Sequence, residues 1–193
     1  MNDLDTSNYN KGFYLSIGKQ GSGKTLLITK LLSDNIKEHP KRKVFSNYTL
    51  FGIDYQPIAF DTSTERNKDK INILDTLDKD PDFFNGSIMT LDEIHIDLDS
   101  LDFMKKNNRR MQKFFSQLRK RKILLLGTTQ YLMNVDVRLR RQCLNVFEMK
   151  HIKKDIFEVT THDIDGYYSV PISKYIVDLS DYYDIYDTNE VIE

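Results

Sequence analysis

The chain has 193 residues, a formal net charge of −1 and a single cysteine, Cys143. One cysteine excludes an intrachain disulfide and a cysteine-rich metal site, and the balanced charge by itself indicates no polyanionic partner. No apolar stretch approaches the length of a membrane span and the N-terminus lacks a secretion signal, so we expect an intracellular protein without a membrane segment. The length suits one domain over residues 1–193, with a flexible N-terminus over 1–11 and a C-terminal extension over 152–193.

A phosphate-binding loop is predicted near the N-terminus. Gly18, Gly23, Lys24 and Thr25 fit the pattern G-x-x-x-x-G-K-[ST], between a strand-like run over 13–17 and a helix-like run that starts at Thr25 and ends near Glu38. In such a loop the backbone amides and the helix dipole bind phosphate, the lysine reaches the terminal phosphates, and the threonine hydroxyl is offered to Mg²⁺. The residues expected to bind the nucleotide are Gly18, Lys19, Gln20, Gly21, Ser22, Gly23, Lys24, Thr25 and Leu26.

The next segments are short. The sequence predicts a strand over 43–48, irregular or extended structure over 51–60, a polar surface loop over 61–70 and a short helix over 71–77.

Two adjacent carboxylates, Asp92 and Glu93, come near the end of an apolar strand predicted over 87–95. Phosphoryl chemistry needs an acid at the end of a buried strand beside the phosphate loop to hold Mg²⁺, and Asp92 is expected to be that acid. Glu93 is then placed to polarise water for attack on the γ-phosphate. The alternative is that both are ordinary acids at a strand end.

A long helix is expected from Asp102 to about Lys120, with Met104, Met111, Phe115 and Leu118 near one face. Between Lys105 and Lys122 there are nine Lys or Arg residues and no acid, whereas acids recur after Lys174. The sequence therefore predicts a basic side and an acidic side of the molecule.

A buried strand over 123–130 ends in Thr128, Thr129 and Gln130. Parallel sheets place ligands at the carboxyl ends of their strands, so these groups should face the same phosphate as Asp92. Gln130 is expected to orient water or to sense the γ-phosphate, unless it is a polar strand end without a role.

Three arginines follow within four residues, at 138, 140 and 141, before a strand over 144–151. Arginines can bridge phosphate oxygens in a transition state, touch nucleic acid or pair with surface acids.

In the tail, the Asp-Gly at 165–166 predicts a hairpin. Tyrosines including Tyr175 and Tyr182 are expected to pack against the protein with one edge in contact with solvent rather than to stack on bases.

Four elements occur in order: the phosphate loop, the Asp-Glu strand, the Thr-Thr-Gln strand end, and an Asp-x-Arg-x-Arg segment over 136–140. This order resembles the FtsK–HerA superfamily of DNA-pumping ATPases. The chain is also similar to the genome-packaging ATPases of icosahedral viruses with internal membranes, particularly viruses of archaea. That similarity rests on Leu-Arg-Lys-Arg-Lys at 118–122, Gly-Thr-Thr-Gln-Tyr at 127–131, Arg-Arg-Gln-Cys at 140–143 and Tyr-Asp-Thr-Asn-Glu at 186–190. It covers residues 12–151 well and the tail loosely.

The resemblance implies a three-layer α/β/α P-loop NTPase core of the RecA/ASCE type, with a central, mostly parallel sheet and a small β-rich C-terminal extension. It implies ATP and Mg²⁺ as cofactors and a homo-oligomeric ring, a hexamer or pentamer, with ATP at the subunit interfaces. Double-stranded DNA would occupy the ring's channel, and a viral capsid or membrane vertex protein would be a further partner. The expected activity is ATP hydrolysis that drives DNA into a preformed capsid, in the host cytoplasm and in association with the virion.

Each candidate residue then has an expected role. Lys24 and the loop amides hold the phosphates, Thr25 and Asp92 hold Mg²⁺, Glu93 activates water, and Gln130 reports the γ-phosphate. One arginine completes the site of the adjacent subunit, from Arg138, Arg140, which we prefer, or Arg141. DNA contact is expected on the basic helix, because backbone charge dominates sequence-independent binding. The residues nominated for it are Lys105, Lys106, Arg109, Arg110 and Lys113; the alternative is a solvated helix face or a subunit contact.

Two other functions remain open. Morphogenesis or secretion ATPases of filamentous phages that resemble zonula occludens toxin share the P-loop and a Thr-rich strand, but they ordinarily carry a membrane span, which this sequence does not display. A nucleotide kinase would need an acceptor pocket and usually an arginine-bearing lid, and neither is visible in the sequence.

Overall fold

A single mostly parallel sheet forms the centre of the molecule. The computed structural model describes residues 9–65, 67–97, 106–164 and 169–187, and within them nine strands pair in the order β4-β3-β2-β5-β6-β1-β7-β8-β9. All pairs from β4 to β7 are parallel, whereas β8 and β9 are added by antiparallel pairing. The strands are β1 (Gly12–Ile17), β2 (Val44–Ser46), β3 (Gln56–Ala59), β4 (Ile71–Asn72), β5 (Ile88–Leu91), β6 (Leu124–Thr129), β7 (Cys143–Lys153), β8 (Ile156–Ile164) and β9 (Ser169–Asp178).

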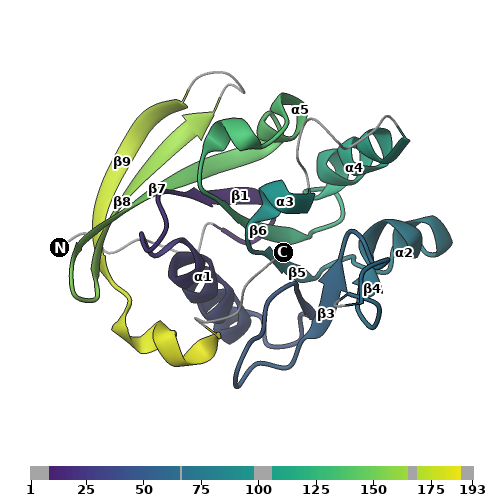
Figure 1. Ribbon diagram of the computed structural model, residues 1–193, viewed down its shortest axis with the longest axis horizontal. Helices are drawn as coiled ribbons and strands as arrows, with labels where there is room; N and C mark the ends of the chain where they lie inside the picture. Colours follow the sequence, from purple (N-terminus) through teal and green to yellow (C-terminus); the bar gives the residue numbers. More distant parts are fainter. Residues whose placement is uncertain (1–8, 66, 98–105, 165–168, 188–193) are drawn as a thin grey trace.

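Helices cover both faces of this sheet (Figure 1). They are α1 (Lys24–Glu38), α2 (Ile73–Lys79), α3 (Ile94–Asp97), α4 (Lys106–Gln117) and α5 (Val137–Arg140), with two 3₁₀ turns, η1 (Leu132–Asn134) and η2 (Ser180–Ile185). The helices and the mostly parallel sheet confirm the predicted α/β class and its three layers.

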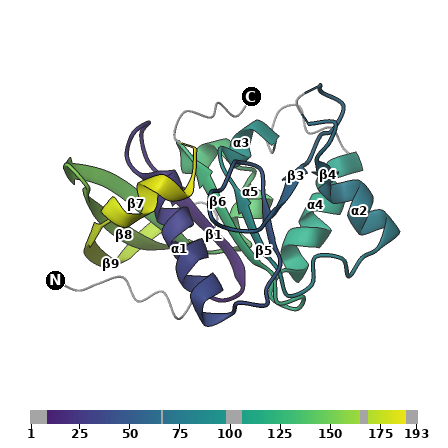
Figure 2. The same ribbon diagram turned by 90° about the horizontal axis from the view of Figure 1, so that it is seen from below.

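Alternating side chains of the strands divide the core in two. In β1, Phe13 and Leu15 pack into a cluster with apolar residues of α2, α4 and α5, whereas Tyr14 packs on the other face with residues of α1. Seen from below the sheet, η2 lies beside α1, to which Tyr182 is linked by a hydrogen bond between its hydroxyl and Lys30 Nζ (Figure 2). Both faces of β1 are therefore buried, as expected for a strand inside a parallel sheet.

The C-terminal extension completes the α1 side of the core. Strands β8 and β9 widen the sheet, and Tyr175, Tyr182, Tyr183 and Tyr186 are partly buried against the cluster that contains α1. The prediction that the tail tyrosines are packing residues is confirmed for these four. The expected turn at 165–166, like Tyr167 and Tyr168, lies outside the described residues.

Some boundaries differ from the prediction. The strand expected over 87–95 ends at Leu91, because the chain turns at Glu93, whose φ is 48°, and continues as α3. The segment 71–77 starts as the two-residue strand β4 before α2, where the Asn72 side chain accepts a hydrogen bond from Asp75 N and begins the helix. The basic helix ends at Gln117 rather than near Lys120, and its predicted first turn lies outside the described residues.

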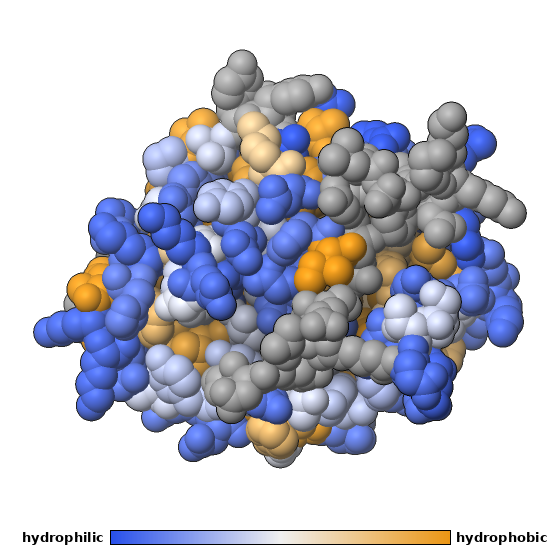
Figure 3. Space-filling view, viewed as in Figure 1, coloured by the Kyte–Doolittle hydropathy of each residue, from blue (hydrophilic) through white to orange (hydrophobic). Residues whose placement is uncertain are grey.

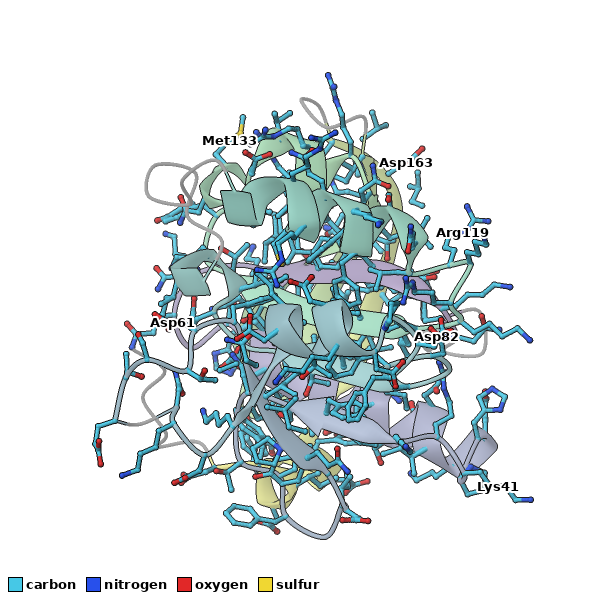
Figure 4. All side chains as sticks on the ribbon, turned by 90° about the vertical axis from the view of Figure 1, so that its right-hand side faces the viewer. Lys41, Asp61, Asp82, Arg119, Met133 and Asp163 are labelled. Carbon is cyan, nitrogen blue, oxygen red and sulfur yellow. The ribbon has the colours of Figure 1, made fainter. Side chains whose placement is uncertain are left out.

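The two ends of the parallel strands form two separate surfaces. Figure 4 shows Lys41, which precedes β2, and Arg119, which precedes β6, at one end, while Met133, which follows β6, projects at the other. The face in Figure 3 is mostly hydrophilic, with scattered hydrophobic residues, as is usual for a protein surface. None of the helices over the described residues is long and apolar enough to cross a membrane.

Candidate nucleotide site

The loop predicted to bind phosphate connects the end of β1 to the start of α1. Gly18, Gly21 and Gly23 have φ values of 147°, 73° and 88°, a region that L side chains rarely adopt. Helix α1 begins without a capping side chain and without an acid in its first turn. Its first N–H groups and its positive dipole end are therefore free to bind an anion.

Lys24, in the first turn of α1, reaches back over this loop. Its side chain is buried, 6% exposed, and Nζ donates to the carbonyl of Lys19 at 3.2 Å. Its charge also acts on the Asp92 and Glu93 carboxylates. The lysine thus lies between the loop and the two predicted catalytic acids.

Asp92 meets the loop through Thr25. Thr25 Oγ1 donates to Asp92 Oδ1 at 3.0 Å, and the Thr128 hydroxyl, from the end of β6, donates to the same oxygen. Burial raises the pKa of Asp92, while the hydrogen bonds from Thr128 and Thr25 and the charge of Lys24 act in the opposite direction. The structure therefore brings Asp92 and Thr25 together, as the sequence predicts.

Asn47 fixes the backbone at Asp92. The Asp92 N–H donates to Asn47 Oδ1 at 2.7 Å, and Asn47 Nδ2 donates to the Asp92 carbonyl at 2.9 Å. Asn47 follows β2, the strand next to β5, and its side chain is 6% exposed. Asn47 is not among the residues predicted from the sequence, although a polar residue at the carboxyl end of a neighbouring parallel strand is the signal that identifies Gln130.

Glu93 is held in a fixed position beside Asp92. Its N–H donates to Thr128 Oγ1 at 2.9 Å, and its Oε2 lies 3.2 Å from His95 Nδ1, which is also 3.2 Å from Thr129 Oγ1. Burial raises the pKa of Glu93, Lys24 and His95 lower it, and the Asp92 charge raises it. Glu93 Oε2 is buried, and among the described residues His95 Nδ1, at 3.2 Å, is close enough for an ion pair but makes no hydrogen bond with it, so this oxygen keeps the capacity to accept one.

The oxygen atoms of Thr25 and Asp92 suit Mg²⁺. This ion prefers hard oxygen ligands and is usually bound by one or two protein groups together with substrate phosphates and water. In the part of the chain that the structure describes, His, Cys, Asp and Glu residues form no group of three or more able to hold a metal alone. A hydroxyl and a carboxylate beside a phosphate loop fit an ion shared with a nucleotide.

Gln130 lies at the same end of the sheet. It lines a cavity of about 650 Å³ together with residues Gly18 to Ser22 of the loop and residues Glu148 to His151 of β7. Strand β6 lies between β1, which leads into the loop, and β5, which leads into the acids, so the residue that follows β6 lies at the same edge of the sheet as both. The cavity has room for the rest of a nucleotide whose phosphates the loop holds.

The three arginines differ in exposure. Arg140 is 7% exposed, and its Nη1 contacts Met133 Sδ at 2.8 Å, whereas the Arg138 side chain is 48% exposed and pairs with Asp136 at 2.7 Å. Arg141 is exposed. An enclosed guanidinium has to leave its packing before it can reach a neighbouring copy, so we move our preference from Arg140 to Arg138 and Arg141.

One basic residue of α4, Arg110, is less available than the sequence suggested. Arg110 lies 2.5 Å from Asp78 and 3.5 Å from Asp75, two acids of α2, so it joins two helices rather than offering its full charge to solvent. Arg109 and Lys113 are exposed. Lys105 and the Lys106 side chain lie outside the described residues.

Solved structures share this fold. The N-terminal domain of zonular occludens toxin from Neisseria meningitidis superposes with a TM-score of 0.68 at 21% sequence identity, over 91% of this chain and 98% of that one. The genome packaging NTPase B204 from Sulfolobus turreted icosahedral virus 2, in complex with ATPγS, gives 0.55 at 13% identity, over 86% and 98%. The chain has the fold of a P-loop NTPase. The DNA-packaging ATPase B204 from Sulfolobus turreted icosahedral virus gives 0.52 at 12% identity, over 84% and 97%.

The viral genome-packaging ATPases named by the sequence resemblance and a zonula occludens toxin domain, from the group that the sequence left open as an alternative, thus both appear among the structures that share this P-loop NTPase fold. The sequence itself matches no protein-family model and no curated protein. The toxin domain has the higher TM-score and identity of the two groups.

His95→Ala is expected to lower kcat for ATP hydrolysis about 10- to 100-fold with little change in KM, because a small misplacement of a reacting group is costly. The reason is that His95 Nδ1 lies between Glu93 Oε2 and Thr129 Oγ1, 3.2 Å from each, and holds the glutamate. Steady-state phosphate release measures the effect. His95→Asn, which keeps a nitrogen donor near the Nδ1 position, should recover part of kcat; equal loss in both variants would show that His95 acts only through packing.

Proposed function

We propose that this chain is a Mg²⁺-dependent ATP hydrolase that, as a homo-oligomeric ring, translocates double-stranded DNA into a preformed viral capsid. The observation that supports hydrolysis is the convergence of Lys24, Thr25, Asp92 and Glu93 at one end of the sheet. The shared fold of the two B204 proteins, described as a packaging ATPase and a packaging NTPase, supports the biological setting. The proposed location is the host cytoplasm and the assembling virion, with a capsid or vertex protein as a partner.

Each residue has one task in the proposed reaction. The amides of Gly21 to Lys24 and the Lys24 ammonium bind the phosphates, and Thr25 and Asp92 hold the metal ion. Mg²⁺, when bound, neutralises the charge that develops on the phosphate oxygens. Glu93 accepts a proton from a water molecule, and the oxygen of that water attacks the γ-phosphate. Gln130, after β6, contacts the γ-phosphate and reports whether it is present.

Phosphate release measured with and without double-stranded DNA tests this function. Hydrolysis stimulated by DNA is the expected result, because a translocating motor hydrolyses ATP productively only while it is bound to DNA. Transfer of phosphate to a nucleoside would instead indicate a nucleotide kinase. Absence of both activities in a folded, oligomeric protein would contradict the proposal.

A morphogenesis or secretion ATPase is the second candidate, favoured by the higher TM-score of the toxin domain, 0.68 against 0.55. The two candidates share the nucleotide site and differ in what hydrolysis moves. An ATPase rate that is insensitive to DNA at every length and salt concentration would favour the second candidate.

Mixing two inactive chains tests whether an arginine acts in trans. A chain with Arg138→Ala and Arg141→Ala keeps Glu93, and a Glu93→Gln chain keeps the arginines. An interface at which the first chain supplies Glu93 and the second supplies the arginines therefore contains a complete site. Mixed oligomers should recover measurable phosphate release with a maximum at an intermediate ratio. Intact oligomers without recovery at any ratio would exclude these two arginines from a role in trans.

A further inference from the structure

A second, basic cavity lies at the opposite end of the sheet from the nucleotide site. It has a volume of about 720 Å³, and its lining includes Lys11, Lys41, Lys43 and Lys122, all of them exposed. Lys11, Lys43 and Lys122 come just before β1, β2 and β6, whose parallel order places their amino ends at one edge. Lys41 projects at this end in Figure 4, as does Arg119.

Arg42 holds the segments that carry these lysines in fixed positions. Its guanidinium donates to the carbonyls of Asn10, Gly86, Ser87 and Lys122 at 2.8–3.0 Å, and to Asn35 Oδ1 at 2.7 Å. Burial lowers the pKa of Arg42. One side chain thus joins the residue before Lys11, the end of α1, the start of β5 and Lys122. The four lysines are therefore presented by a connected part of the fold and not by independent loops.

Over the described residues, no ion pair neutralises the lysines of this surface. None of the four lysines forms an ion pair with another residue in the part of the chain that the structure describes. Lys43 Nζ lies 5.8 Å from the centre of the Phe83 ring, and Glu38 is the acid among the lining residues. Four ammonium groups with one carboxylate produce a positive potential that attracts polyanions.

We propose that this surface, formed by Lys11, Lys41, Lys43 and Lys122, binds the phosphate backbone of double-stranded DNA. The proposal rests on the proposed DNA-translocating function and names the surface that would contact the DNA. Backbone contacts by lysine carry no sequence information, as a motor that must pass every sequence requires. The surface replaces α4 as our main candidate, since Arg110 of α4 is engaged with α2.

The composition favours nucleic acid over a protein partner. The cores of protein interfaces are enriched in aromatic residues and depleted in lysine. Among the residues that line this cavity, Phe83 is the aromatic one and lysine is the most frequent type. The acidic tail of a second copy is the competing occupant.

Helix α1 connects the basic cavity to the nucleotide site. Helix α1 has 15 residues and starts at the phosphate loop, so at about 1.5 Å per residue its other end lies about 20 Å away. That end supplies Glu38 and His39 to the basic cavity. A rigid element therefore joins the two surfaces.

The test compares the wild-type chain with a variant that carries Lys11→Gln, Lys41→Gln, Lys43→Gln and Lys122→Gln. Binding to a fluorescently labelled 30-base-pair duplex is followed by anisotropy over a series of salt concentrations, and ATPase activity is measured without DNA. Removing four phosphate contacts should reduce the slope of log K against log salt concentration by about 3 to 4 and lower affinity more than 100-fold near 0.1 M salt. The DNA-independent ATPase rate should stay within twofold of wild type.

Control variants separate the outcomes. The α4 variant with Arg109→Gln and Lys113→Gln should keep most of the DNA affinity. If the quadruple variant fails to fold, the single variant Lys41→Glu takes its place and should weaken DNA binding. Wild-type DNA affinity and salt slope in a folded quadruple variant would overturn the proposal. Loss of oligomerisation with DNA binding retained would also overturn it, and would indicate that the surface binds the acidic tail of a second copy. If the wild-type chain hydrolyses ATP but binds no duplex, both this proposal and the translocation function fail, whereas the nucleotide site stands.

Discussion

Glu93→Gln is expected to lower kcat for ATP hydrolysis by about 10²- to 10⁴-fold, the usual contribution of a general base. The amide has the shape of the carboxylate but cannot accept the proton of the attacking water. The hydrogen bonds that position the neighbouring backbone persist, because the N–H of residue 93 still donates to Thr128 Oγ1 and Asn47 still accepts from the Asp92 N–H. ATP affinity should therefore change little. Single-turnover phosphate release and equilibrium binding of a fluorescent ATP analogue measure the two quantities separately.

A matched carboxylate elsewhere makes that result specific. Glu158, in β8, pairs with Lys174 of β9 at 3.1 Å, so Glu158→Gln also removes one negative charge. It should leave kcat within twofold of wild type. If Glu93→Gln retained wild-type kcat, Glu93 would not be the base, and the buried carboxylate of Asp92 would have to be considered for that role.

The nucleotide site could largely be predicted from the sequence because it depends on local patterns and one topological rule. The loop from Gly18 to Thr25 identifies itself by its glycines, and parallel strands bring the residues that follow them to one edge. That rule was sufficient to bring Asp92, Thr128 and Gln130 to the loop. Lys11, Lys43 and Lys122, which precede parallel strands, meet at the opposite edge by the same rule, but their grouping becomes evident only once the strand order is known.

Other features depend on packing that no local pattern encodes. In a strand continued to residue 95, Glu93 and His95 would share one face with Cα atoms about 6–7 Å apart. The turn at Glu93, with φ at 48°, instead brings His95 Nδ1 to 3.2 Å from Glu93 Oε2. Arg140 is 7% exposed, and its Nη1 contacts the Sδ atom of Met133 in η1. Arg110 is neutralised by acids of α2 that are distant in the sequence. In each case the outcome is decided by a partner that only the three-dimensional fold supplies.

Gly23→Ala is expected to destabilise the fold by about 2–5 kcal/mol, the sum of a left-handed backbone cost of about 1–2 kcal/mol and an overpacking cost of about 1–3 kcal/mol. Gly23 has a φ of 88°, and an added Cβ would lie 2.6–3.2 Å from ring atoms of Phe157. Phe157 is 2% exposed in the core cluster that contains α1, so the ring has little room to move. Urea unfolding without nucleotide measures the effect.

Gly21→Ala is the matched control for the backbone term. Gly21 has a φ of 73°, but apart from its two chain neighbours no atom of the described residues lies within 4 Å of its added Cβ, so only the conformational cost of about 1–2 kcal/mol applies. Equal destabilisation by the two variants would contradict the packing explanation. A larger loss at Gly23 would show that Phe157, in a strand of the C-terminal extension, packs directly against the phosphate loop. The loop can then keep its backbone conformation only where residue 23 has no side chain, because the ring occupies the space that a Cβ would need.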